Sequence, residues 1–450
     1  MSYLAALAHK KIAVVGAGVT GAAVLDFLIA RGINADIFDE RSPGALRNVE
    51  SSYNLAIVSP GWRVDHAILN TLRAGGCELI SEVDFAWLVK EEIAPNQKWI
   101  GLTGTNGKTT TIQMVQSIFD FSSKSGVACG NVGDPVISIL ASGEHFDFLA
   151  VELSSFQLDW SQLPRFEAVA LLNIAPDHID WHGSFDAYAL AKLKLLEAGN
   201  IAIINGEDSE SVLRSTSWGG KKVFYYLDTP RAGEIGLVEN LLIDRAFSAD
   251  PSHAIEFSQL SDIHPSVPHN VSNAMAAAGL ALAIGISHEE IRAGLQNFTL
   301  DRHRLELVLE HEGVTWVNDS KATNPHAAAA SLLSHISSIW IAGGLAKGAE
   351  MGPLIERCAV RIKAAILIGQ DAPIIATALS KYAPNIPYFI MPFNGDSEEL
   401  MRDVVAKAQG LASAGDTVLL APACASMDQF ADYADRGEKF VAMVKEVVGR

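Results

Sequence analysis

The chain has 450 residues, of which 49% are hydrophobic and 19% charged, and its formal net charge is −18. This length suits about three domains, each with its own core. The negative charge repels nucleic acid, so we expect no nucleic-acid partner and small ligands instead. Because no apolar run reaches the roughly 18 residues of a membrane span and the N-terminus does not read as a signal peptide, we expect a cytoplasmic protein without membrane insertion. Four widely spaced cysteines without a C-x-x-C pair predict reduced, packed thiols.

The first block of the chain has the pattern of a dinucleotide-binding unit. A short apolar strand at 11–15 leads into a glycine turn at 16–21, a helix at 22–30 and a strand at 35–38 that ends at Asp39. Taken alone, this pattern indicates an NAD-dependent dehydrogenase whose acid binds ribose hydroxyls. A later strand at 55–58 runs into Ser59-Pro60-Gly61, a second turn at the same edge of a parallel sheet, where ligands gather.

The most informative stretch is Gly104-Thr105-Asn106-Gly107-Lys108-Thr109-Thr110, which follows an apolar strand at 99–102 and precedes a helical pattern. Its glycines let backbone N–H groups face one concavity, Lys108 supplies a cation for the outer phosphates, and Thr109 offers a hydroxyl to Mg²⁺. The usual spacing has glycine where this chain has Leu102, so the loop is a variant cradle. The stretch predicts a nucleoside triphosphate site.

Further strands at 148–151, 168–172 and 201–204 alternate with helices, which implies a mostly parallel sheet covered on both faces. The less regular region 218–264 suggests a small antiparallel annex. A third block repeats strands at 315–317, 338–342, 364–368 and 417–421. The predicted fold is therefore α/β with three domains: a Rossmann-like domain at 1–95, a central P-loop ATPase-like domain at 96–300, and a Rossmann-like domain at 301–450.

Three further features bear on chemistry. Glu152 ends a strand beside the phosphate loop, where a carboxylate can hold Mg²⁺, although a solvated strand-end glutamate is the alternative. The segment 173–182 is dense in metal-capable groups, of which His178 is the favoured ligand, with Asp177, Asp180 and His182 as orienting or capping residues. By its pattern alone, segment 188–194 is an amphipathic helix with its lysines in water.

The order of these motifs resembles that of the Mur ligases over essentially the whole chain. The matching segments are 104–109, 152–158, 173–178, 188–192, 269–273, 303–306 and 319–324. Segments 319–324 and 422–430 are similar to those of the D-glutamate-adding members. The resemblance implies a cytoplasmic, monomeric, ATP-dependent ligase that joins D-glutamate to UDP-N-acetylmuramoyl-L-alanine through an acyl phosphate and a tetrahedral intermediate.

The resemblance also implies the residues of the site. Lys108, Glu152, His178 and Lys192 are the implied catalytic residues. Two Mg²⁺ ions are expected, with Thr109 and Glu152 on one, His178 on the other, and Lys192 bridging toward the second as a carbamate. The implied ATP-binding residues are Gly104, Thr105, Asn106, Gly107, Lys108, Thr109, Thr110, Asn270, Arg304 and Asp319.

For the substrates, the resemblance turns the first glycine turn into a uridine diphosphate site. The residues implied for the nucleotide sugar are Val19, Thr20, Asp39, Arg41, Ser59, Gly61 and Asn131, and those for D-glutamate are Lys321, Thr323, Lys347, Ser426 and Tyr433. Two positions depart from the family pattern: Glu40 replaces a small hydroxyl residue, and Tyr433 replaces a phenylalanine.

The alternatives are a sister ligase and a dehydrogenase. A diaminopimelate-adding ligase would be expected to carry an Asp-Asn-Pro-Arg motif, which this sequence lacks, whereas a folylpolyglutamate-type ligase would share the ATP domain. A dehydrogenase leaves Lys108 and Glu152 unexplained. A non-catalytic homologue would be expected to have lost Lys108, Glu152 or His178, and the sequence retains all three.

Overall fold

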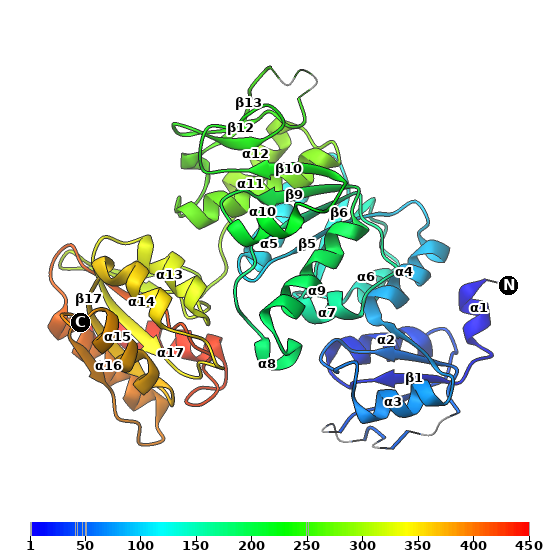
Figure 1. Cartoon of the computed structure of the whole chain (residues 1–450), viewed down its shortest axis with the longest axis horizontal. Coiled ribbons are helices and arrows are strands. Elements are labelled where there is room, and N and C mark those ends of the chain that lie inside the picture. The colour runs from blue at the N-terminus through cyan, green and yellow to red at the C-terminus, as the bar shows by residue number, and fades with distance from the viewer. Residues whose placement is uncertain are drawn as a thin grey trace. The chain divides into compact units, whose positions relative to one another are not determined.

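A computed structural model describes residues 2–40, 42, 44–46, 48–49, 52–248, 250 and 252–449. Three β-sheets organise these residues (Figure 1). The chain divides into two compact units. The first unit comprises Met1–Ile174, Gly183–Ser266 and Asn270–Phe298, and the second comprises Ala175–His182, Val267–His269 and Thr299–Arg450. The domain boundaries at 95 and 300 remain predictions.

The first sheet is parallel, with strand order β2-β1-β3-β4. Its strands and helices are α1 (Tyr3–Leu7), β1 (Ile12–Val15), α2 (Val19–Ile29), β2 (Ala35–Phe38), β3 (Leu55–Val58), α3 (Ala67–Ala74), β4 (Glu78–Ser81) and α4 (Glu82–Ile93). The four residues of β1 and the four of β3 are all buried, as continuous apolar runs predict for strands covered on both faces. The glycine turn therefore lies at the carboxyl edge of this sheet, as predicted.

The second sheet has nine strands in the order β13-β12-β11-β10-β9-β8-β5-β7-β6. They are β5 (Lys98–Thr103), β6 (Gly126–Gly130), β7 (Phe148–Glu152), β8 (Ala168–Leu171), β9 (Ile201–Asn205), β10 (Lys221–Tyr225), β11 (Ile235–Val238), β12 (Leu241–Asp244) and β13 (Ile255–Gln259). Strands β5 to β11 pair in parallel, and β11, β12 and β13 pair antiparallel. The predicted antiparallel annex is confirmed, but it continues the central sheet.

Helices cover this central sheet. They are α5 (Lys108–Asp120), α6 (Val136–Ser142), α7 (Ser155–Trp160), α9 (Phe185–Ala198), α10 (Ser209–Ser215), α11 (Pro268–Ala283) and α12 (His288–Asn297), with a 3₁₀ turn at Leu260–Asp262. Helix α12 packs closely on α5, since a Cβ at Gly294 would lie 2.5 Å from the Ile118 Cα. On the other face, side chains of α7 and α9 share one apolar core with the first sheet.

Helix α4 joins the first and second sheets through buried carboxylates. The Asp84 Oδ1 accepts hydrogen bonds from the backbone N–H groups of Gln162 and Leu163, both at 2.9 Å. The Glu82 Oε1 accepts one from the Ile137 N–H at 3.0 Å. These bonds give partners to buried backbone N–H groups. A buried N–H group without a partner would destabilise the fold.

The second unit contains a six-stranded sheet in the order β14-β15-β19-β16-β17-β18. Its elements are α8 (Ile179–His182), β14 (Glu306–His311), β15 (Val314–Asn318), α13 (Pro325–Leu333), β16 (Ser338–Gly343), α14 (Gly352–Cys358), a 3₁₀ turn at Ala359–Arg361, β17 (Ile362–Ile368), α15 (Ala372–Tyr382), β18 (Tyr388–Ile390), α16 (Ser397–Leu411), β19 (Thr417–Leu420) and α17 (Tyr433–Val447). All pairs are parallel except the edge hairpin β14–β15, which the sequence did not predict.

Alternation along β16 divides the core of the second unit. Trp340 and Ala342 pack with α13, α14 and α15, whereas Ile339 and Ile341 pack with α16 and α17. The period of two places successive side chains on opposite faces, so this sheet is covered on both sides. The α/β class is thus confirmed, and the doubly wound third block is confirmed apart from its antiparallel edge.

Two expectations from composition can be compared with the described residues. All four cysteines are free and buried. Among the described residues, no helix combines the length and apolarity that crossing a bilayer requires.

We predict that Glu82→Gln changes how stability depends on pH. Burial raises the pKa of the Glu82 carboxyl from its usual 4.5 to about 7, with Asp84 adding to the rise and the Ile137 N–H opposing it. Because the folded-state pKa lies above the unfolded one, Glu82 weakens folding progressively as the pH rises from about 4.5 to 7. Glutamine keeps an acceptor and cannot ionise. The variant should gain up to roughly 3 kcal/mol over the parent between pH 5 and pH 8.

The measurement is the free energy of unfolding in denaturant at both pH values. Glu78→Gln, which changes an exposed carboxylate on the neighbouring strand, is the matched control. An equal pH dependence in the parent and in Glu82→Gln would contradict the prediction.

Candidate functional site

The phosphate loop lies between β5 and α5 at the carboxyl edge of the central sheet. Gly107 has φ 83° and directly precedes the first helical residue, Lys108. A Cβ at Gly107 would lie 2.5 Å from the Asn273 Oδ1, and a Cβ at Gly104 would lie 2.9 Å from the Leu172 Cβ. Both positions therefore require glycine, and the amino end of α5, where the helix dipole favours negative charge, faces the cradle. The half-buried Thr109 and the buried Thr110 belong to the first turn of α5.

Asn173 holds this loop from the end of the neighbouring strand β8. Its Oδ1 accepts from the Asn106 N–H at 2.8 Å, and its Nδ2 donates to the Asn106 carbonyl at 3.0 Å. Its own carbonyl accepts from the Thr105 N–H at 3.0 Å. The sequence reasoning gave Asn173 no individual role. The available signal was its place after a strand that pairs with the strand of the phosphate loop.

Two lysines converge on one carbonyl oxygen of the loop. The Nζ atoms of Lys108 and Lys192 each donate to the Gly104 carbonyl at 2.8 Å. The prediction of a solvated Lys192 is wrong: this side chain on α9 is 1% exposed, whereas Lys194 on the same helix is 40% exposed. Two neighbouring cations repel each other in a buried setting, so a polyphosphate or another anion placed between them would relieve that repulsion.

Tyr188, one turn before Lys192, connects the same helix to the loop. The Lys192 Nζ lies 4.7 Å from the centroid of the Tyr188 ring. The Tyr188 hydroxyl lies 2.8 Å from the Thr105 Oγ1, within a hydrogen bond. Helix α9 is therefore fixed to the phosphate loop at two points, and the lysine is positioned by packing on an aromatic face.

Glu152 presents a buried carboxylate at the end of β7, and its alternative as a solvated glutamate is excluded by its 0% exposure. The Asn131 Nδ2 donates to the Glu152 Oε1 at 3.0 Å. Within the described part of the chain, the Oε2 is buried and has no hydrogen-bond partner. A buried, unpaired carboxylate oxygen is costly unless a cation binds it.

These residues fit a magnesium ion. Nowhere in the described ranges do three His, Cys, Asp or Glu side chains gather as a complete metal cage. Mg²⁺ usually takes only one or two carboxylates and completes its six positions with water and phosphate oxygens. A single buried carboxylate oxygen such as the Glu152 Oε2 is therefore enough to serve as a protein ligand of Mg²⁺.

At the edge of the first sheet, Asp39 orders the glycine turn. Its Oδ2 accepts from the Ala17 N–H at 2.8 Å and its Oδ1 from the Ser42 N–H at 3.0 Å. The Ser59 hydroxyl donates to the Gly16 carbonyl at 3.4 Å, so the two predicted turns are adjacent. The carboxylate of Glu40 lies 3.2 Å from the His66 Nε2, which gives this acid a partner within the same sheet.

The remaining residues predicted for the nucleotide sugar differ in accessibility. Val19 is 75% exposed, Thr20 is half-buried, and Gly61 is exposed. Arg41 lies outside the described residues. In the central sheet, Asn270 is buried and its Nδ2 donates to the Pro265 carbonyl at 3.1 Å.

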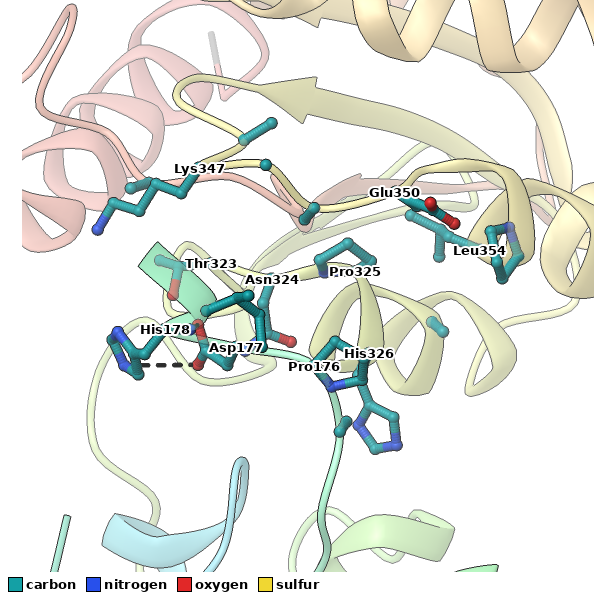
Figure 2. Close-up of a pocket in the computed structure, with 18 of the residues that line it drawn as sticks. Pro176, Asp177, His178, Thr323, Asn324, Pro325, His326, Lys347, Glu350 and Leu354 are labelled. Atoms are coloured by element: carbon teal, nitrogen blue, oxygen red, sulfur yellow. Dashed lines mark hydrogen bonds and ion pairs between the residues drawn. The ribbon is translucent and has the colours of Figure 1, made fainter. Parts of the chain in front are cut away.

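In the second unit, a cavity of about 560 Å³ brings together His178, Thr323 and Lys347 (Figure 2). Figure 2 shows these three side chains toward one end of the cavity and Glu350 toward the other. His178 and Lys347 have positive φ values of 51° and 49°, so both loops hold strained backbone at the cavity.

Asp177 orients the His178 ring. The Asp177 Oδ1 accepts from the His178 N–H at 3.0 Å, and its Oδ2 lies 3.6 Å from the His178 Nε2. The interaction is drawn as a dashed line in Figure 2. The structure therefore gives Asp177 a contact suited to the orienting role that the sequence suggested.

The other predicted residues of the second unit lie around the ends of β15 and β19. The Lys321 Nζ lies 3.7 Å from the centroid of the Tyr433 ring, a cation–π contact that the hydroxyl of this tyrosine does not prevent. Ser426 is buried. The Asp319 Oδ1 accepts from the Leu305 N–H at 3.3 Å. Burial raises the pKa of Asp319 to about 6, against the opposing effects of that bond and of the half-buried Arg304.

Comparison with protein families matches two parts of the chain. Residues 102–281 match the Mur ligase middle domain, and residues 303–424 match the Mur ligase glutamate ligase domain. A UDP-N-acetylmuramoylalanine--D-glutamate ligase of Thermobifida fusca is 42% identical, covering 98% of this chain and 100% of that protein. The ligase of the same name from Streptomyces coelicolor is 39% identical, covering 97% and 98%.

Solved structures with the same fold are more distant in sequence. A pseudomurein peptide ligase type C from Methanothermus fervidus aligns with TM-score 0.61 and 18% identity over 97% of this chain and 100% of its own. The MurF ligase from Thermotoga maritima in complex with ADP aligns with TM-score 0.60 and 16% identity over 100% and 99%. These likenesses confirm the predicted three-domain α/β fold.

We predict that Gly107→Ala weakens ATP binding. Alanine at φ 83° is strained, and its Cβ would also meet the Asn273 Oδ1 at 2.5 Å, so the cradle must open. Gly143 is the matched control, since it has φ 76° but nothing within 4 Å of its Cβ position. Both variants lose roughly 1–2 kcal/mol of stability from the left-handed backbone. We expect the Kd for ATP by calorimetry to rise about tenfold or more only in Gly107→Ala. An unchanged Kd would contradict the role of this close approach.

Proposed function

The chain belongs to the Mur ligase family, and from this membership we propose that it joins D-glutamate to UDP-N-acetylmuramoyl-L-alanine in the synthesis of peptidoglycan precursors. Members of this family are ATP-using ligases, and the names of its near full-length relatives support D-glutamate as the acceptor. The observation that carries the proposal is the convergence of Lys108 and Lys192 on Gly104 beside the buried carboxylate of Glu152. This is a site for a triphosphate and a cation.

In this proposal the phosphate loop binds ATP. The backbone of residues 104–107 and the amino end of α5 surround the β- and γ-phosphates, and Lys108 exchanges its carbonyl contacts in the loop for phosphate oxygens. The further ATP contacts are assigned to Asn270, Arg304 and Asp319. Asp319 is assigned to the ribose hydroxyls, and its pKa of about 6 leaves it largely ionised, and so a stronger acceptor, above neutral pH.

Two Mg²⁺ ions would be held by Thr109 and Glu152 and by His178, with a carbamate on Lys192 reaching the second. Bound there, Mg²⁺ supplies charge neutralisation for the triphosphate and the substrate carboxylate. Carbamylation would turn a buried cation beside Lys108 into an anion and would remove the repulsion between the two ammonium groups.

The two substrates would meet at the transferred phosphoryl group. The carboxylate of the L-alanyl residue attacks the γ-phosphorus, giving an acyl phosphate and ADP. The D-glutamate amine then adds to the acyl carbon, and the tetrahedral intermediate expels phosphate. Since water would hydrolyse the acyl phosphate, the site has to exclude it.

The acceptor and the nucleotide sugar are assigned to separate groups of residues. Lys321, Thr323, Lys347, Ser426 and Tyr433 would bind D-glutamate. Val19, Thr20, Asp39, Arg41, Ser59, Gly61 and Asn131 would bind the nucleotide sugar. Cations and hydroxyls suit the two carboxylates of glutamate. The Glu40 contact with His66 supports a role for this acid away from the diphosphate.

A sister ligase or a folylpolyglutamate-type ligase remains the second candidate, because the fold is shared. FolC of E. coli, solved with DHPP and ADP, aligns with TM-score 0.54 and 17% identity. The acceptor is the substrate that distinguishes these candidates.

We predict that phosphate release from ATP and Mg²⁺ requires both UDP-N-acetylmuramoyl-L-alanine and D-glutamate. L-glutamate and meso-diaminopimelate should give less than about one-hundredth of the rate, since a misplaced charged group is left unpaired in the site. The measurement is continuous phosphate release with each acceptor in turn. Release with diaminopimelate or with a folate substrate instead would assign a sister ligase, and release with none of them would reject the substrate assignment.

We predict that Lys192→Ala lowers the rate of phosphate release by roughly 10–100-fold, because the variant loses a metal ligand or a group that positions one. Added acetate or formate should partly restore this rate. Lys194→Ala is the matched control, because this side chain lies on the same helix and contacts Asp159 instead. Labelled bicarbonate should give a ¹³C carbamate signal in the parent and in Lys194→Ala but not in Lys192→Ala. Full activity of Lys192→Ala without an added carboxylate would contradict the carbamate.

A further inference from the structure

Arg436, on α17, is a fully buried arginine that the proposed reaction does not use. Its side chain is 0% exposed, and it is among the largest fully buried side chains of the described residues. In the described ranges it forms no ion pair with a carboxylate, and its hydrogen bonds go to carbonyl oxygens and one hydroxyl. A guanidinium buried in this way is rare unless its donors are satisfied by well-placed acceptors.

The acceptors belong to three different loops. The Arg436 Nε donates to the Ser320 Oγ at 3.0 Å, and an Nη donates to the Ser320 carbonyl at 2.9 Å. The other Nη donates to the carbonyls of Cys424 at 3.2 Å and Gly343 at 3.4 Å. The planar, rigid fork of a guanidinium fixes the directions of these bonds, which a lysine could not do.

The three loops follow three adjacent strands of the sheet. Strand β19 lies between β15 and β16, and both pairs are parallel, so all three strands end at the same edge. Ser320 follows β15, Gly343 ends β16, and Cys424 follows β19. The Arg436 side chain therefore contacts the segments at the carboxyl ends of three adjacent strands, β15, β19 and β16.

Each loop carries at least one residue assigned to the acceptor, and the loop after β15 carries both Lys321 and Thr323. Lys321 is the next residue after Ser320, Ser426 lies two residues after Cys424, and Lys347 lies four residues after Gly343. Arg436 is also linked to Tyr433, a residue assigned to the acceptor at the start of α17. The Ser320 hydroxyl that Arg436 contacts donates to the Tyr433 carbonyl at 2.7 Å. Tyr433 in turn lies 3.7 Å beneath the Lys321 Nζ.

Backbone hydrogen bonds also join these loops, and each of those bonds connects two of the three. The Leu345 and Ala425 backbones bond to each other at 2.8 and 3.0 Å, and the Ala423 N–H donates to the Ala322 carbonyl at 2.9 Å. These bonds link the loops in pairs. Arg436 contacts all three loops at once. Burial also lowers the pKa of Arg436 to about 10, so the group stays charged at neutral pH and its bonds remain charge-assisted.

We propose that Arg436 is a positioning residue for the acceptor: its guanidinium sets the mutual spacing of the loops that carry Lys321, Lys347 and Ser426, and this spacing matches the two carboxylates of the acceptor. The proposal rests on the proposed function, because it takes D-glutamate as the acceptor. A residue that merely stabilises the fold would not change the KM of one substrate selectively. Loss of the Arg436 side chain is expected to change the KM for D-glutamate.

The test measures KM for D-glutamate, KM for ATP and kcat in Arg436→Lys, Arg436→Ala and Ser320→Ala. We expect KM for D-glutamate to rise about tenfold or more in the two arginine variants. A smaller rise is expected in Ser320→Ala, which removes the hydroxyl bonds to the Arg436 Nε and to the Tyr433 carbonyl and keeps the Ser320 carbonyl as an acceptor. KM for ATP should stay within about twofold. Guanidinium ion added at millimolar concentration should partly lower the KM for D-glutamate of Arg436→Ala, whereas methylammonium should not.

The matched control is Phe440→Leu, one turn further along α17. Phe440 is fully buried and packs on Trp316, so its truncation lowers the stability of the fold. Its ring contacts Trp316, which belongs to strand β15 and not to the three loops. Thermal unfolding of each variant ranks the destabilisation. A rise in KM for D-glutamate that Phe440→Leu does not share supports the positioning role.

Each contrary result has its own meaning. If the parent releases no phosphate with D-glutamate, the proposed function fails and this inference fails with it. If the parent is active and the arginine variants lose only stability, like Phe440→Leu, the inference alone is wrong. If neither arginine variant folds, Ser320→Ala decides the matter: a raised KM for D-glutamate supports the inference and an unchanged one overturns it.

Discussion

Strand β5 pairs in parallel with β7 on one side and with β8 on the other, and this constraint determines the phosphate site. Parallel strands end at the same edge, so the loop after β5 lies between Glu152, which ends β7, and Asn173, which follows β8. Asn173 then supplies the amide bonds that fix the loop. Glu152 supplies the buried carboxylate beside it. Neither contact is local in sequence.

The same constraint operates in the second unit with a different result. Strands β15, β19 and β16 end side by side, and three loops follow them. Their loops are joined instead by the guanidinium of Arg436 from α17. In both units the sheet brings distant segments to one edge, and a buried polar group then sets their final spacing. Hydrogen bonds have the directional precision for this that apolar packing lacks.

Buried charged side chains therefore lie at the carboxyl edges of two sheets, where they contact the loops of the candidate site. Lys192 and Glu152 are almost completely buried at the central sheet, and Arg436 is fully buried at the third. Each would destabilise the fold if left without partners, so its neighbours are constrained as well. Glu82 shows the same logic away from the site. Its buried carboxyl joins the first two sheets through one backbone N–H and has a raised pKa as a consequence.

The sequence by itself determined the elements and their chemistry. Apolar runs bounded by glycine turns predicted β1, β5, β7, β16 and β19 to within about two residues, because buried parallel strands are continuously apolar. The phosphate loop was recognisable because its spacing is local. The density of metal-capable groups in segment 173–182 favoured His178. The family motifs supplied Lys321 and the remaining predicted site residues, which composition and periodicity alone would not have assigned.

Only the tertiary structure decided which side chains meet and which are buried. A helical pattern placed Lys192 and Lys194 alike in water, yet packing of α9 on the central sheet buries the first and leaves the second half-buried. The edge strand β14 was missed because its residues are only partly buried and carry charges, so its pattern is weak. The contacts that Asn173 and Arg436 make gave no local signal, since their partners are separated from them by 67 and up to 116 residues. Such contacts depend on the order of strands in a sheet, which the sequence specifies only through the fold as a whole.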